Sequence, residues 1–304
     1  MITFAHATKR YGPTTALDDL TVTVRPGSVT GLLGPNGAGK STALRLALGL
    51  DRATAGDVTV HGIPYRALRH PLRTVGAHVD ARAFHPGRSA RAHLTALARY
   101  NRIPARRVDD VLGLVGLSDV AGKRAGGFSL GMAQRLGLAG ALLGDPEVVL
   151  LDEPVNGLDT DGVLWLRGLL RDLADQGRTV LLSSHLLSEL EVTADHVVVL
   201  GRGRLLADLP IADLVGRDAP VVVRTPDAPA PLADALVEIG HHPQVDGHGL
   251  TVDGVDVTLV GDLAHALGLR VHHLAPAPVT LEARYLDLVA DDVQYRARPE
   301  ERIA

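Results

Sequence analysis

The sequence of 304 residues contains no cysteine, which excludes disulfide bonds and metal sites built on cysteine. Aromatic residues make up only 3% of the chain, whereas 46% of it is hydrophobic. This composition is typical of a folded α/β protein with a core of Leu, Val and Ala. The net charge is -4 and there is no basic tract, which argues against a nucleic-acid partner.

Long apolar runs are also missing. The longest, such as residues 148–151, 180–182 and 197–200, are far shorter than the roughly 20 residues that a helix needs to cross a bilayer. The first six residues lack the basic segment and apolar core of a secretory signal. We therefore expect a chain that stays in the cytoplasm and forms no membrane pathway by itself.

Two regions with different patterns follow one another along the chain. In residues 1–215, short β-rich runs alternate with longer helical patterns, which predicts a mainly parallel sheet covered by helices. Residues 148–151 and 179–182 are apolar on both faces, as is typical of central strands. A Pro-rich stretch at residues 225–231 lies near the start of the second region, residues 216–304.

The second region predicts a small α+β domain. Its pattern indicates strands at residues 221–224, 250–252 and 255–260, and helices at 232–239, 263–267 and 281–289.

The strongest motif fits the pattern G-x-x-x-x-G-K-[ST] and consists of Gly34, Pro35, Asn36, Gly37, Ala38, Gly39, Lys40 and Ser41. It lies between an expected strand at residues 29–33 and an expected helix at 42–50, which opens with Thr42. The glycines let backbone N–H groups point at phosphate oxygens, and the start of the helix adds its dipole. We predict that Lys40 reaches the β- and γ-phosphates and that Ser41 ligates Mg²⁺.

Two acids follow the apolar run at residues 148–151. Asp152 and Glu153 would lie at the carboxyl edge of a parallel sheet, where ligands bind. Asp152 is predicted to hold Mg²⁺ and Glu153 to polarise the water that attacks the γ-phosphate. An isolated strand can simply end in polar residues, but together with a complete phosphate loop this pair predicts a P-loop NTPase.

Phe128, Ser129, Leu130, Gly131 and Met132 resemble the signature sequence of ABC ATPases. Ser129 and Gly131 match its most characteristic positions, whereas Leu130 and Met132 depart from the commonest Ser-Gly-Gly-Gln form. Ser129 also occupies the N-cap position of an expected helix. The resemblance implies that this helix start contacts the γ-phosphate bound by a second copy, so that a homodimer encloses two ATP molecules.

Further positions resemble those of ABC ATPases. Tyr11 resembles the aromatic residue that stacks on adenine, although a lone Tyr in a turn is more often structural. Asp159 resembles the acid in the loop that connects the two sites, and His185, after residues 179–184, resembles the switch histidine. Asp80 follows residues 75–79, where the family usually has a glutamine that touches Mg²⁺ and the membrane partner. The carboxylate of Asp80 is a candidate ligand for the metal.

The resemblance implies a P-loop fold in residues 1–215, with a mixed sheet and a helical subdomain at about 85–140. Residues 279–288 look similar to the C-terminal extension of ATPases in drug and antibiotic exporters. The predicted function is therefore the ATP-hydrolysing subunit of an exporter of drugs, antibiotics or lipid-like compounds. It would work on the cytoplasmic face of the membrane with a separate transmembrane permease. An importer ATPase and a soluble, non-transport ABC ATPase remain alternatives.

Overall fold

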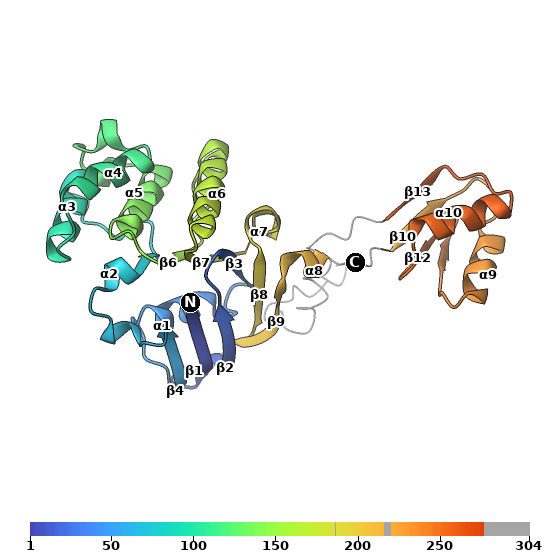
Figure 1. The fold of residues 1–304 in the computed structure, drawn as a ribbon, viewed down its shortest axis with the longest axis horizontal. Coiled ribbons are helices and arrows are strands. Elements are labelled where there is room, and N and C mark those ends of the chain that lie inside the picture. Colours follow the sequence, from blue (N-terminus) through green and yellow to red (C-terminus); the bar gives the residue numbers. More distant parts are fainter. Residues whose placement is uncertain (186, 216–219, 277–304) are drawn as a thin grey trace, which may run out of the picture. The chain divides into compact units, whose positions relative to one another are not determined.

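The protein, described by a computed structural model over residues 1–185, 187–215 and 220–276, comprises two units (Figure 1). The first unit contains Met1–Ile211, and the second begins at Ala212. None of the helices in these described ranges combines the length and the apolar character that crossing a membrane requires.

In the described part of the first unit, a six-stranded sheet has the order β5-β6-β7-β3-β8-β9. The strands β5, β6, β7, β3 and β8 are parallel, and β9 pairs antiparallel with β8. All of β7 and the first four residues of β6 are buried, so the prediction of central strands there is confirmed. The strand bounds are β3 (Ser28–Leu33), β5 (Val75–His78), β6 (Val148–Asp152), β7 (Thr179–Ser184), β8 (His196–Gly201) and β9 (Arg204–Pro210).

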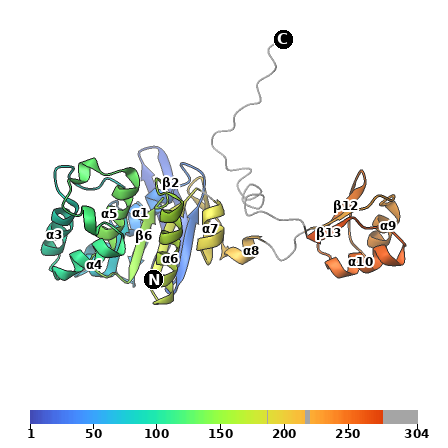
Figure 2. The ribbon, with the colours of Figure 1, turned by 90° about the horizontal axis from the view of Figure 1, so that it is seen from above.

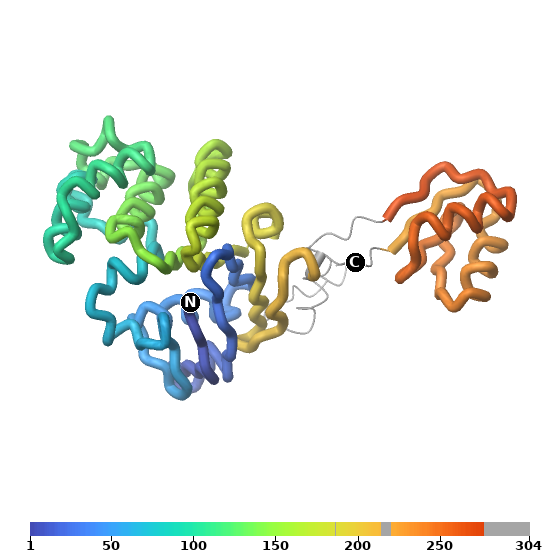
Figure 3. The backbone as a smooth tube through the Cα atoms, viewed as in Figure 1, coloured from blue at the N-terminus to red at the C-terminus, as the bar shows by residue number. Residues whose placement is uncertain are grey.

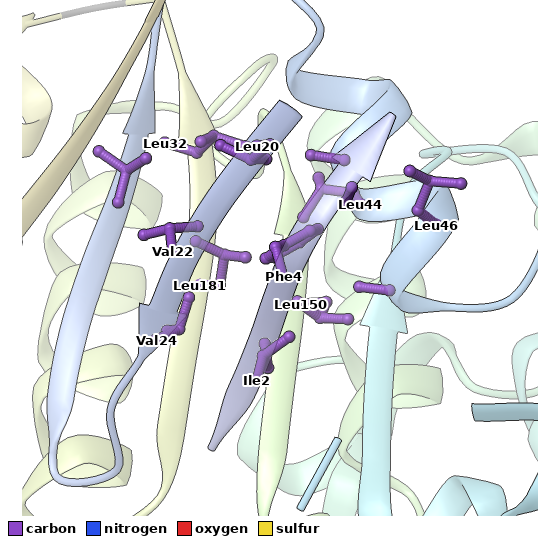
Figure 4. Packing of buried hydrophobic residues seen from close by; sticks show 14 of the residues in the cluster. Ile2, Phe4, Leu20, Val22, Val24, Leu32, Leu44, Leu46, Leu150 and Leu181 are labelled. Carbon is purple, nitrogen blue, oxygen red and sulfur yellow. The ribbon is translucent and has the colours of Figure 1, made fainter. Parts of the chain in front are cut away.

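An antiparallel sheet of order β2-β1-β4 completes the sheet structure of this unit, with β1 (Ile2–Tyr11), β2 (Thr14–Val24) and β4 (Ala55–Val60). In β2, Leu20, Val22 and Val24 are buried and alternate with exposed threonines, as expected for a strand with one face in the core. Figure 4 shows the resulting cluster, in which apolar side chains of both sheets and of the helix after β3 pack together: Ile2, Phe4, Leu20, Val22, Val24, Leu32, Leu44, Leu46, Leu150 and Leu181.

The helices of this unit include a group, α3, α4 and α5, whose members pack on one another (Figure 2). Figure 3 lets the reader follow the chain from this group back into β6. The group occupies the region where the resemblance places a helical subdomain, whose boundaries stay a prediction. The helix bounds are α1 (Lys40–Ala47), α2 (Pro71–Thr74), α3 (Ala90–Tyr100), α4 (Arg106–Leu114), α5 (Leu130–Leu142), α6 (Thr160–Asp175) and α7 (Leu187–Thr193). The short helix α8 (Ile211–Val215) begins at Ile211 of this unit and continues into the second.

Helix α1 is shifted from the expected range of residues 42–50. It starts two residues earlier, directly after Gly39, and ends at Ala47. Gly49 has a φ of +60°, a left-handed conformation that terminates helices. The apolar Leu50, which lengthened the expected helix, is 52% exposed beyond this end.

The second unit has an antiparallel sheet of order β11-β12-β10-β13 and, after the short helix α8 at its start, the helices α9 and α10 in its described residues. Its elements are β10 (Val221–Arg224), α9 (Ala230–Glu238), β11 (Gln244–Asp246), β12 (Gly249–Val252), α10 (Val257–Ala266) and β13 (His273–Pro276). Apolar side chains from the sheet and both helices form a separate small core: Val221, Val223, Leu232, Leu236, Leu250, Val252, Val260 and Ala264.

One expected strand of the second unit, at residues 255–260, is wrong. This segment begins α10, and the Asp256 side chain accepts a hydrogen bond of 2.7 Å from the Thr258 N–H as an N-cap. Val260 and Ala264 are buried four residues apart, which is the spacing of a helix face. Strands β11 and β13 were not predicted, because neither contains a fully buried residue. The helix expected at 281–289 lies outside the described residues.

Candidate functional site

The carboxyl ends of neighbouring parallel strands bring the candidate residues to one edge of the sheet. Asp80 follows β5, Asp152 ends β6, and His185 follows β7. The phosphate loop follows β3. A cavity of about 650 Å³ opens at this edge, a volume that suits a nucleotide-sized ligand. Its lining includes Tyr11, residues 35–42, Asp80, Leu130, Asp152 and Glu153.

The phosphate loop holds its lysine inside the protein. Gly39 has a φ of +106°, and a Cβ atom there would lie 2.6 Å from the Ala16 carbonyl oxygen, so only glycine fits. Lys40 is 7% exposed, and its Nζ donates to the carbonyl of Gly34 at 2.5 Å and to that of Pro35 at 3.3 Å. The residues of the first turn of α1 line the cavity, at a helix end that suits anions.

Burial and nearby acids act on Lys40 in opposite directions. Desolvation lowers the pKa of Lys40, and the carboxylates of Glu153 and Asp152 partly offset this by raising it. The Lys40 ammonium group therefore lies close to both acids. Its burial costs desolvation energy, which a bound anionic ligand would offset.

Ser183, on β7, holds the two acids in place. Its Oγ donates to Asp152 Oδ1 at 2.5 Å and accepts from the Glu153 N–H at 2.9 Å. Glu153 has a φ of +48°, a left-handed conformation that is uncommon for a residue other than glycine. Such strain persists only where surrounding contacts enforce it, and it is frequent at functional sites.

His185 lies within hydrogen-bonding distance of Glu153, and their roles as orienting group and base stay a prediction. The distance between His185 Nδ1 and Glu153 Oε2 is 2.6 Å. The His185 side chain is 46% exposed and the Glu153 side chain 24% exposed. Both side chains are partly exposed, and Glu153 lines the cavity, whereas His185 lies outside its lining.

Tyr11, at the end of β1, is fixed by its surroundings. Its hydroxyl donates to Asp51 Oδ2 at 2.6 Å, and Lys9 Nζ lies 4.7 Å from the centre of its ring. Arg45 also donates to Asp51 at 2.7 Å, and these two hydrogen bonds lower the pKa of Asp51 to about 2. The ring of Tyr11 borders the cavity with a defined orientation.

The signature segment lies at the start of α5. Ser129 is the N-cap, and its Oγ accepts from the Met132 N–H at 3.2 Å, so the expected cap is confirmed. Asp159 is likewise the N-cap of α6, where Oδ1 accepts from the Gly162 N–H at 2.8 Å. Among the described residues that line the cavity, Leu130 represents this segment, whereas Ser129, Gly131, Met132 and Asp159 lie outside it.

Two residues of the site were not identified from the sequence. Ser183 is a hydroxyl residue within an apolar strand, and its pairing with Asp152 follows from the strand register. Gln134 is 4% exposed on α5 and also lines the cavity. A signal existed for Gln134, because it is a polar residue two positions after the signature segment, in a helix whose other residues, apart from Arg135, are apolar or glycine.

The loop, the buried lysine and the acids together leave an open cavity with the size and charge for a nucleoside triphosphate. A parallel sheet that carries such a phosphate loop, lysine and pair of acids at its carboxyl edge defines a P-loop nucleotide-binding protein. Residues 17–156 match the family model described as ABC transporter, and residues 219–282 match a domain of unknown function.

Named relatives support the same assignment. The chain is 41% identical to the bacitracin transport ATP-binding protein BcrA of Bacillus licheniformis over 214 residues, which are 69% of this chain and 70% of that protein. It is 35% identical to the Nod factor export ATP-binding protein I of Burkholderia orbicola (strain AU 1054) over 306 residues, covering 96% and 98% of the two chains. The chain therefore belongs to the ATP-binding proteins of ABC transporters, and it is an ATPase.

Solved structures agree on the fold. An ATP-binding subunit of an ABC transporter matches 70% of this chain and 91% of its own, with a TM-score of 0.65 and 25% identity. The dimeric bacterial ABC transporter cassette MJ0796 matches 69% of this chain and 99% of its own, with a TM-score of 0.64 and 23% identity. The prediction of a P-loop ABC ATPase fold with a mixed sheet is confirmed.

Proposed function

We propose that this protein is the ATPase subunit of an exporter, and that two copies enclose two Mg-ATP molecules to drive a separate transmembrane permease. The observation that carries the proposal is that some candidate residues border the cavity while others lie outside it. Lys40 and Glu153 border the cavity, whereas Ser129 and Gly131 lie outside it on an accessible helix start. A second copy that brings its own Ser129 segment to this cavity would complete it.

The oxygen donors at the cavity fit Mg²⁺. Ser41, Asp80 and Asp152 line it, and hydroxyl and carboxylate oxygens are the ligands this ion prefers. In the described ranges, no group of three or more His, Cys, Asp or Glu side chains is arranged to hold a metal, so phosphate oxygens would share the coordination. When bound, Mg²⁺ would neutralise charge on the phosphates.

The protein's own groups have distinct roles in this proposal. Lys40 would bind the β- and γ-phosphates from the loop that holds it, and Glu153 would accept the proton of the attacking water. His185, hydrogen-bonded to Glu153, would orient that water. Ser183 would keep Asp152 and Glu153 in register, because its hydroxyl bonds to both.

Export rests on the relatives named above. One is named for bacitracin transport and another for Nod factor export, and each covers at least two thirds of this chain. A direct test is to copurify this chain with its transmembrane permease and to measure ATP-driven transport in proteoliposomes. Export predicts movement of substrate away from the face that binds this chain. Dependence on a solute-binding protein would instead indicate an importer.

Dimer formation has its own test on the purified chain. With ATP and Mg²⁺, a variant slow in hydrolysis is expected to elute from size exclusion as a dimer and, without nucleotide, as a monomer. Light scattering then gives the mass. A chain that binds ATP only as a monomer would contradict the proposal.

Replacing Tyr11 by alanine is expected to raise the dissociation constant for ATP about tenfold, because stacking of a base on an aromatic ring contributes on the order of 1–3 kcal/mol. Tyr11→Phe should stay within about twofold, since the ring remains although its bond to Asp51 is lost. Titration with a fluorescent ATP analogue measures both variants. Equal affinity of Tyr11→Ala and the wild type would make Tyr11 purely structural.

Replacing Asp80 by alanine is expected to raise the Mg²⁺ concentration for half-maximal hydrolysis about tenfold, because an oxygen ligand at the cavity is removed. Asp80→Gln, which installs the residue usual in the family, should lie closer to the wild type. Asp119→Ala removes an exposed carboxylate away from the cavity and serves as the control. An unchanged magnesium dependence in Asp80→Ala would exclude Asp80 as a ligand.

A further inference from the structure

Two buried polar side chains, His78 and Gln134, connect β5, α5 and the loop after β6. They are 3% and 4% exposed. Gln134 Nε2 donates to the carbonyl oxygen of Asn156 at 2.8 Å, and Gln134 Oε1 is hydrogen-bonded to His78 Nε2. The carbonyl of Asn156 can only accept, so the amide orientation is fixed and His78 must donate through Nε2. The hydrogen-bond chain therefore runs in one direction, from His78 through Gln134 to Asn156.

Helix α5 is shaped to receive the imidazole. Gly137 lies one turn after Gln134, and a Cβ atom on Gly137 would overlap the His78 ring. A side chain at position 137 would displace the ring from its bond with Gln134. The close approach of β5 and α5 therefore depends on Gly137, which leaves room for the His78 ring of the hydrogen-bond chain.

The ends of this chain lie next to the groups of the proposed reaction. His78 precedes Asp80 by two residues at the end of β5. Asn156 lies in the loop between Glu153 and Asp159, and its N–H donates to the Glu153 carbonyl at 3.2 Å. Gln134 belongs to the helix that begins after Ser129. One amide side chain thus joins the helix of the signature segment to the loop that carries the candidate base.

We propose that Gln134 and His78 are positioning residues that couple the two nucleotide sites of the dimer. This inference rests on the proposed function, in which Ser129 faces the nucleotide of the other copy while Glu153 faces its own. Movement of α5 when the dimer closes would be transmitted through Gln134 to Asn156, and so to the position of Glu153. A buried polar link suits this task, because a side chain that loses its partner there has no water to replace it.

Gln134→Met tests the coupling, because methionine has a similar length and neither hydrogen bond. We expect kcat for ATP hydrolysis to fall about tenfold while KM and the affinity for a fluorescent ATP analogue stay within about twofold. We also expect the Hill coefficient to fall towards 1. The control is Thr30→Val, which removes a buried hydroxyl from β3, a strand separated from β5 by two others. It should leave kcat and the Hill coefficient unchanged.

A matched pair at position 78 tests the direction of the hydrogen bond. His78→Leu has no donor and should reproduce the loss in Gln134→Met, whereas His78→Gln supplies an amide donor and should restore most of kcat and the cooperativity. Equal damage in His78→Leu and His78→Gln would overturn the inference, because only packing would then matter. A normal kcat and Hill coefficient in Gln134→Met would overturn it as well.

The wild-type chain separates failure of this inference from failure of the proposed function. If the wild type hydrolyses ATP cooperatively and Gln134→Met does so equally well, only the coupling role is wrong. If the wild type forms no ATP-dependent dimer, the proposed function fails, and the coupling between sites fails with it.

Discussion

Replacement of Glu153 by glutamine is expected to lower ATP turnover on the order of 10²–10³-fold, with little change in ATP affinity. The substitution keeps the shape of the side chain but removes the group that accepts a proton from water. The backbone of Glu153 is held at a φ of +48°, and its N–H is bonded to Ser183. The side-chain amide of the introduced glutamine should therefore occupy the position of the Glu153 carboxylate. A loss of turnover would then report chemistry rather than folding.

Steady-state hydrolysis and nucleotide titration on the purified chain measure this prediction. Glu147→Gln is the matched control, because Glu147 directly precedes β6 and Glu153 follows its other end. The Glu147 side chain is 73% exposed and should tolerate the change. Normal turnover in Glu153→Gln would assign the base to another group. Loss of nucleotide binding as well would indicate that the glutamate positions the cavity instead.

The phosphate loop and the two acids at the carboxyl edge of the six-stranded sheet could be predicted, because each leaves a local signal in the sequence. A Gly-rich loop between a strand and a helix, and two acids after an apolar strand, need only short-range patterns to be identified. The parallel pairing of β6 with β7 then follows from their apolar runs, and it brings His185 to Glu153 without any local signal joining the two. Residues 153 and 185 are far apart in sequence, so resemblance to a family was needed to connect them.

Other features were decided by tertiary contacts. Ser183 and Gln134 act through hydrogen bonds to residues about 20 or 30 positions away, which no periodicity encodes. In the second unit, the β-branched residues of 255–260 favoured a strand, but the Asp256 cap and burial of Val260 and Ala264 produce α10. Local propensity was outweighed there by capping and by packing on the sheet.

Removal of the lysine charge in Lys40→Met is expected to lower turnover on the order of 10²–10³-fold and, unlike Glu153→Gln, to weaken ATP binding. The buried ammonium at the loop is the positive group that would offset the phosphate charge. Burial lowers the pKa of Lys40, so the charged form gains less in the folded protein than it would in water, and a similarly sized apolar side chain should keep the melting temperature within about 3 °C. Lys123→Met, at an exposed position, is the control.

A mixing experiment with the same variant tests whether two copies share each site. Lys40→Met lacks the phosphate-binding group, and Ser129→Arg would block the helix start that is proposed to reach the other copy. Each should be inactive alone. In a heterodimer, one site carries both defects and the other carries none, so an equal mixture should regain about a quarter of wild-type turnover if the sites act independently. Coupling between the two sites would make the recovery smaller than a quarter. No recovery in the mixture, with both variants folded and able to associate, would mean that Lys40 of one copy and Ser129 of the other do not form a site that works independently.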